Sequence, residues 1–187
     1  MIRPCHSESV TADDAPRYVS RLDLQLETMR FEIPDMEDRI TNVVTILIDG
    51  DDVLGAPRDS PGAYVRSSDD TRPDAMGWTP EQILGARSPL LATGRARRVA
   101  VYVCSCGESG CANRAPIIYE RDGLVHWDDI RLVTGLFYGP ERYESGVDPL
   151  EITEYNSREC DVDNVVFDAE HYRAEIVRAS RELLGRS

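Results

Sequence analysis

A two-residue turn between two runs of strand-forming residues constrains the fold of this chain more than any other feature. Residues 117–119 (Ile-Ile-Tyr) form one run, residues 124–127 (Leu-Val-His-Trp) form the other, and Asp122-Gly123 lies between them. Asp-Gly is among the strongest short signals for a β-hairpin, because both residues tolerate the positive φ angles of a tight turn. The pattern predicts two neighbouring antiparallel strands, with Val125 and Trp127 on the buried face.

Other apolar runs predict further strands. Leu22, Leu24 and Leu26 alternate with polar residues, which is typical of a half-buried strand. The β-branched run 43–48 stops at Asp49-Gly50 and predicts a strand that enters a hairpin turn.

The run 98–104 carries apolar residues on both faces, which predicts a strand in the centre of a sheet. The C-terminus predicts an amphipathic helix over 168–184, with Asp168 as its N-cap and Gly185 as its stop. The apolar stripe of this helix comprises Ala169, Tyr172, Ile176, Ala179 and Leu183.

These elements together predict an α+β fold. It consists of an antiparallel β-sheet of five or more strands, with the C-terminal helix packed on one face. The length of 187 residues suits a single domain, which we expect over 17–187. A flexible arm is expected at 1–16, and a long Gly-, Pro- and Asp-rich loop at 55–77.

The charge balance limits the classes of partner. The sequence holds 34 acidic and 21 basic residues, for a net charge of −13, and every basic residue is arginine. Nucleic acids and anionic membranes would be repelled, so we expect neither as a partner, whereas a basic protein would be attracted. The absence of lysine excludes Schiff-base chemistry and a phosphate-binding P-loop lysine.

We expect a cytoplasmic location. The N-terminal residues lack the apolar run of a secretory signal, and no segment has the roughly 20 apolar residues of a membrane helix. The five cysteines are an odd number in a chain too long to need disulfides for stability, which fits a reducing compartment.

Three cysteines gather in one short segment, C-x-C-x4-C, at Cys104, Cys106 and Cys111. This cluster allows three interpretations: a structural zinc site, a redox pair that forms a disulfide, or reduced cysteines that only pack. Zinc needs a fourth ligand, for which Cys160 or His126 are the first choices. Other options for that ligand are His171, Cys5 and His6.

The segment 126–129 (His-Trp-Asp-Asp) also allows two interpretations. His126 and Asp128 share one side of a strand and could hold a cation or form a histidine–carboxylate pair. The simpler interpretation is that they face water, because alternation with the apolar Val125 and Trp127 predicts it. Near the first hairpin, the aspartates at 49–52 resemble a calcium loop only superficially, and a turn explains them.

No G-x-S-x-G, G-x-G-x-x-G, Walker A or H-E-x-x-H motif occurs in the sequence, so no catalytic residue is assigned. We therefore expect a non-catalytic protein-interaction module, immunity-like or regulatory, with an acidic surface that includes the acidic stretch 141–154. The alternative is a small thiol- or zinc-dependent enzyme, or a redox sensor, that uses Cys104, Cys106 and Cys111.

The order of several motifs resembles a group of uncharacterised bacterial proteins, mostly actinobacterial. The motifs are the CxCGxxGC block at 104–111, the V-x-W-D-D strand at 125–129 and the F-D-A-E-x-Y helix start at 167–172, together with 46–50 and 89–91. Ala112 stands where many of these proteins have a glycine. The resemblance implies no activity, cofactor or catalytic residue, because none is established for the group.

Overall fold

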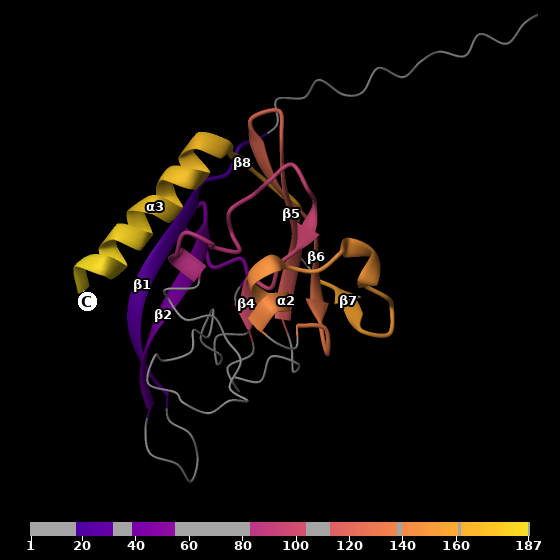
Figure 1. Cartoon of the computed structure of the whole chain (residues 1–187), viewed down its shortest axis with the longest axis horizontal. Coiled ribbons are helices and arrows are strands. Elements are labelled where there is room, and N and C mark those ends of the chain that lie inside the picture. The colour runs from indigo at the N-terminus through magenta and orange to yellow at the C-terminus, as the bar shows by residue number, and fades with distance from the viewer. Residues whose placement is uncertain are drawn as a thin grey trace, which may run out of the picture.

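The fold of the chain is α+β in a computed structural model (Figure 1). The structure describes residues 18–31, 39–54, 83–103, 113–137, 140–160 and 162–186. The predicted arm at 1–16 and the predicted loop at 55–77 lie outside these residues, so the division into domains stays a prediction. Among the helices of the described residues, none is long and apolar enough to cross a membrane.

The two N-terminal strands form a hairpin sheet of their own. β1 (Leu22–Phe31) pairs antiparallel with β2 (Arg39–Ile48), from Leu22 opposite Ile48 to Phe31 opposite Arg39. The predicted alternation of β1 is confirmed, since its leucines are buried. The predicted turn after β2 is confirmed too: Asp49 and Gly50 have φ angles of 56° and 89°, and Ile48 pairs with Asp51 across the turn.

The larger sheet has the predicted hairpin at its centre. β5 (Asn113–Arg121) and β6 (Leu124–Val133) pair antiparallel, and Asp122 and Gly123 turn the chain with φ angles of 53° and 75°. Val125 and Trp127 are fully buried, as predicted. The outer edge of β6 pairs with β7 (Ser157–Glu159) and β8 (Val165–Asp168), and all strand pairs are antiparallel.

The run 98–104 does not form a central strand. Its described part contributes to β3 (Arg97–Arg98) and β4 (Tyr102–Val103), two short strands on the outer edge of β5. The residues between them are buried because other elements cover this edge, and Arg98 bridges to Val147 on its outer side. Burial on both faces therefore came from tertiary packing and not from a central place in the sheet.

The C-terminal helix α3 (Ala169–Arg186) lies against β1, β8 and β6 (Figure 1). Asp168 caps it as predicted, because its Oδ1 accepts a hydrogen bond of 2.8 Å from the backbone N–H of His171. The predicted apolar stripe is buried, whereas the helix continues through Gly185 to Arg186 and does not stop at the glycine. Between α3 and the sheet, the indole N–H of Trp127 donates to the hydroxyl of Tyr172 at 3.2 Å.

α3 also completes the free edge of β1. The backbone N–H of Leu24 donates to Oε1 of Glu175 at 2.7 Å, and the carbonyl of Leu24 accepts from Nη2 of Arg178 at 2.5 Å. A strand edge leaves such backbone groups without partners. Two charged side chains of the helix therefore supply the donor and acceptor that a third strand would have given at this point.

Candidate functional site

The predicted cysteine cluster lies outside the described residues, so the structure does not test it. Cys104, Cys106 and Cys111 fall between Val103, the last residue of β4, and Asn113, the first residue of β5. Val103 and Asn113 are direct partners across the strand pair, so the two ends of the cysteine segment start from adjacent positions.

The two first choices for a fourth ligand lie at different positions along β6. Cys160 follows β7, which pairs with β6 at Arg131–Val133, and Val133 is also the partner of Asn113. His126 pairs with Tyr119 and Val166 near the other end. Seven residues separate His126 from Val133, which is roughly 23 Å along a strand. β7 runs back from Val133 along β6, so Cys160 follows Glu159, the partner of Arg131, and still lies nearer than His126 to the strand ends that flank the cysteine segment.

The thiol of Cys160 lies in a mixed environment. It is half-buried, and it is a free cysteine. Burial raises the pKa of the Cys160 thiol, while the guanidinium groups of Arg114 and Arg158 act in the opposite direction. Among the described residues, no three His, Cys, Asp or Glu side chains are grouped so that they could hold a metal ion.

His126 does not face water, contrary to the simpler interpretation of its strand. Its side chain is buried, and its ring stacks on the ring of Tyr119 with centroids 4.7 Å apart and planes 4° apart. The hydroxyl of Tyr119 donates to Oδ2 of Asp128 at 2.6 Å. The cross-strand partner Tyr119 thus joins His126 and Asp128, so these two belong to one small polar cluster on the hairpin.

Asp129, the last residue of the V-x-W-D-D motif, lies in a β-bulge. Ala115 faces Arg131 and Ile117 faces Asp128, so two residues of β6 oppose the single residue Pro116 of β5. Asp129 takes a positive φ of 45°, a conformation that aspartate tolerates better than most residues. The bulge interrupts the hydrogen-bond ladder and leaves carbonyl groups that need other donors.

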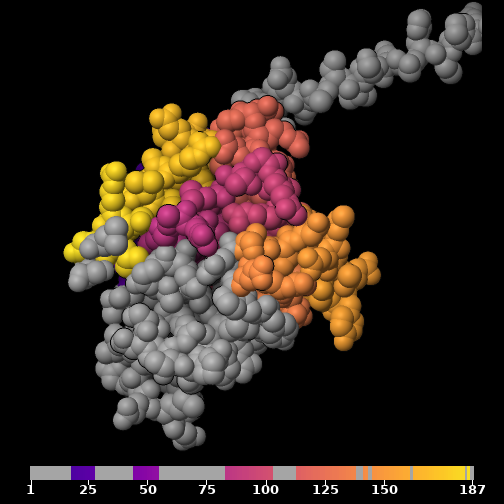
Figure 2. Space-filling model, in the orientation of Figure 1, coloured from indigo at the N-terminus to yellow at the C-terminus, as the bar shows by residue number. Residues whose placement is uncertain are grey.

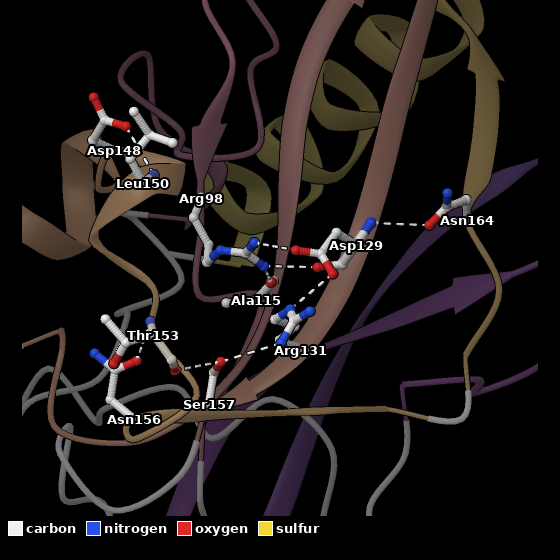
Figure 3. Close-up of polar contacts among 10 residues, drawn as sticks. All are labelled: Arg98, Ala115, Asp129, Arg131, Asp148, Leu150, Thr153, Asn156, Ser157 and Asn164. Carbon is white, nitrogen blue, oxygen red and sulfur yellow. Dashed lines mark hydrogen bonds and ion pairs between the residues drawn. The ribbon is translucent and has the colours of Figure 1, made fainter.

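Arg98 supplies those donors, and sequence reasoning missed it (Figure 3). Its side chain is 1% exposed, and Nη1 donates to the carbonyls of Ala115 and Asp129 at 2.7 Å each. Nη2 lies 2.6 Å from Oδ2 of Asp129, while Nε of Arg131 lies 2.8 Å from Oδ1. Burial alone would raise the pKa of Asp129, but the hydrogen bonds from both arginines hold it below its usual range. This cluster stabilises the sheet at the bulge.

The acidic stretch of the sequence forms a projection beside the sheet, which we define as residues 140–159 and call the acidic projection (Figure 2). It contains α2 (Pro140–Ser145), the 3-10 turn η1 (Pro149–Glu151) and β7. Six carboxylates and two arginines fall within it. In Figure 2 it stands out from the body of the molecule at the side away from α3.

Hydrogen bonds fix the tip of the acidic projection. Oδ1 of Asp148 accepts from the backbone N–H of Leu150, and Oδ1 of Asn156 accepts from that of Thr153, each at 2.9 Å (Figure 3). The hydroxyl of Ser157 donates to the Thr153 carbonyl at 2.9 Å. The tip is thus held by side-chain caps of its own sequence, which favours one backbone conformation.

Further contacts tie the acidic projection to the sheet. The backbone N–H of Thr134 donates to the Asn156 carbonyl at 2.9 Å, and Arg98 and Val147 exchange two backbone hydrogen bonds of 2.9 Å. Gly146, with a φ of 71°, permits this approach, because a Cβ there would lie 2.6 Å from the Arg98 carbonyl oxygen. The projection therefore has a defined position on the fold.

Two large apolar side chains point into solvent from this fixed segment. Leu150 is 90% exposed and Tyr155 is 99% exposed. Exposed apolar residues are common singly, but two on one constrained, charged segment form a feature that interfaces share: apolar anchors with a polar rim. The sequence predicted the acidic stretch. It did not predict the exposure of Leu150 and Tyr155, because that exposure depends on the turns.

Comparison with known proteins gives no assignment for this arrangement. No family model, no curated protein and no solved structure matches the chain.

Proposed function

We propose that this protein is a non-catalytic interaction module, immunity-like or regulatory, that binds a basic protein partner through the acidic projection. The observation that carries the proposal is the pair Leu150 and Tyr155, 90% and 99% exposed on a segment held in place by its own hydrogen bonds. Tyrosine is among the residue types enriched at the few positions that contribute most of the binding energy in protein interfaces.

The charge around Leu150 and Tyr155 indicates which kind of partner surface would complement them. Glu151 lies beside Leu150 and Glu154 beside Tyr155, and both glutamates are exposed. Arg142 compensates Glu151 in part, with 2.8 Å between Nη1 and Oε2. A partner with an apolar pocket rimmed by arginine or lysine complements this surface, and the net charge of −13 accelerates its encounter.

A fixed backbone strengthens this interface. Ordering a loop on binding costs free energy, and a segment that is already capped loses less. The caps from Asp148 and Asn156 therefore predict that removal of the anchors and removal of the caps both weaken the complex, the first through lost contacts and the second through lost preorganisation.

The test is affinity capture from a lysate of the source organism with three baits. The wild type and a Val177→Ser control should retain the same basic protein, since Val177 is 44% exposed on α3 and away from the projection. The Leu150→Ser/Tyr155→Ser variant should lose it. With the captured protein purified, Tyr155→Ala should raise the Kd by at least about 30-fold, the size of an interface hot spot. Salt at about 0.5 M should weaken the complex through screening.

Two outcomes contradict the proposal. One is capture of the same proteins by all three baits, which would make the anchors irrelevant. The other is a captured partner of acidic character whose affinity does not change with salt. Sedimentation of the free protein would detect self-association, the case in which Leu150 and Tyr155 bind a second copy of this chain.

A second candidate is a thiol or zinc function of Cys104, Cys106 and Cys111, and the position of Cys160 favours it. Cys160 lies nearer than His126 to the strand ends that flank the cysteine segment, so it is the better candidate to complete a four-thiolate set. Elemental analysis should then find about one zinc per chain, and Cys160→Ser should lower that content while His126→Ala leaves it unchanged. Metal-free protein with reduced, unreactive thiols would exclude both zinc and redox roles.

A further inference from the structure

A cleft of about 480 Å³ lies where the segment 87–97 meets residues 145–148. In the space-filling view the two segments adjoin on one face of the molecule (Figure 2). Its volume is within the range of sites for small ligands. The acidic projection borders it, but Leu150 and Tyr155 are not part of its lining.

The charge of this cleft is opposite to that of the protein. Arg87, Arg95 and Arg97 line it, and Asp148 is the one acidic residue among its described lining. Oδ1 of Asp148 already accepts a hydrogen bond from the Leu150 backbone. Three arginines around one cavity are an unusual concentration in a chain with 34 acidic and 21 basic residues.

Arg97 is fixed in the cleft by neutral groups only. Its Nη2 donates to the carbonyls of Pro89 and Leu91 at 2.8 Å and 2.7 Å, and its Nη1 donates to the carbonyl of Ser145 at 3.2 Å. A guanidinium has five N–H donors, so two remain for a ligand. Carbonyl groups orient the side chain but do not neutralise it, and its partial burial lowers the pKa of Arg97 from its usual value.

Arg87 and Arg95 add charges that can adjust to a ligand. Both side chains are exposed, and no carboxylate of the described residues forms an ion pair with either. Most exposed arginines near acidic residues form such pairs easily, as Arg142, Arg173 and Arg178 do elsewhere on this protein. The cleft therefore combines one fixed guanidinium with two movable ones.

We propose that this cleft binds a small phosphorylated molecule that carries at least two negative charges. Guanidinium groups bind phosphate oxygens through charge-assisted hydrogen bonds, and the two remaining N–H groups of Arg97 are held in place before a ligand arrives. The overall charge of −13 repels anions at long range, so binding depends on local contacts with the three arginines.

The test is calorimetric titration of the full chain with inorganic phosphate, pyrophosphate and citrate, at constant ionic strength set with chloride. Pyrophosphate should bind with the lowest Kd and one site per chain. Arg87→Gln and Arg95→Gln should each raise its Kd by at least about tenfold, because each removes a charge-assisted contact. Arg181→Gln is the matched control: this arginine is exposed on α3, outside the cleft, and its loss should leave the Kd unchanged.

The proposal is overturned if pyrophosphate gives no heat of binding, or if Arg181→Gln weakens binding as much as the cleft variants do. Tighter binding of citrate would reject phosphate as the recognised group. The Leu150→Ser/Tyr155→Ser variant should bind pyrophosphate normally, so this experiment succeeds or fails independently of the proposed protein interface.

Discussion

Nη2 of Arg98 lies 2.6 Å from Oδ2 of Asp129, across the β5 strand that separates their own strands in the sheet. The same guanidinium donates to the carbonyls of Ala115 and Asp129, which the bulge opposite Pro116 withdraws from the ladder. Arg98 thus provides hydrogen-bond donors at the point where Pro116 and the extra residue of β6 interrupt the ladder.

Arg98→Met should lower the free energy of unfolding by about 2–4 kcal/mol, because it leaves the buried carbonyl of Ala115 and the carbonyl and carboxylate of Asp129 without their donor. Arg131→Met should cost less than about 1 kcal/mol, since its ion pair with Asp129 is more accessible to water. Urea unfolding of both variants measures the difference. Equal losses would show that the carboxylate pair, and not the carbonyl contacts, accounts for the role of Arg98.

The acid stability of the protein should depend on Asp129. Its pKa is lower in the folded state than the unfolded value of about 4, so its contribution is present above that value and is lost as the pH falls through the lower folded pKa. Asp129→Asn should therefore flatten the decline of unfolding free energy below about pH 4. Glu154→Gln is the control, because it removes one exposed carboxylate without changing the contacts of Asp129. An unchanged acid limb in the asparagine variant would contradict this account.

Trp127→Ala should destabilise the fold by about 3–5 kcal/mol, the usual cost of emptying a large aromatic site. Its indole is fully buried, with Phe167 edge-on at a centroid distance of 5.4 Å. Tyr172→Phe keeps the ring but removes the hydroxyl that accepts from Trp127 and donates to the Leu90 carbonyl, so it should cost about 1–3 kcal/mol. Thermal and urea unfolding should rank the two variants in this order.

Ile176→Asp should unfold or aggregate the protein, because Ile176 is 3% exposed on the buried side of α3 and a buried, unpaired carboxylate is costly. Val177→Asp places the same charge on the next residue, which is 44% exposed, and should leave the melting temperature within a few degrees of the wild type. Circular dichroism with size-exclusion chromatography compares the two. Wild-type behaviour of Ile176→Asp would mean that α3 is not docked.

The hairpin and the C-terminal helix could be predicted because their signals are local. Asp122-Gly123 permits one kind of turn, and the Asp168 cap with its apolar stripe specifies both the start and the buried side of α3. Gly185 misled the prediction of the helix end, since a glycine ends a helix only where the chain also has a reason to turn away.

The rest depended on contacts between distant residues. His126 occupies an outward position in the alternation and is buried because Tyr119 stacks on it from the neighbouring strand. Arg98 is a charged residue at the start of an apolar run. It is buried because its side chain binds the bulge at Asp129, which lies 31 residues later in the sequence. The exposure of Leu150 and Tyr155 likewise depends on the geometry of the side-chain caps, and that geometry cannot be predicted from composition.

The contacts of Leu24 can form only after nearly the whole chain has been synthesised. Its N–H and carbonyl bind side chains that follow it by 151 and 154 positions. At the usual translation rate of ~5–20 residues per second, roughly 8–30 s separate the synthesis of these partners. Until Glu175 and Arg178 are synthesised, the Leu24 groups at the free edge of β1 lack these partners, so we expect that edge to be the part of the hairpin most prone to pairing with another strand.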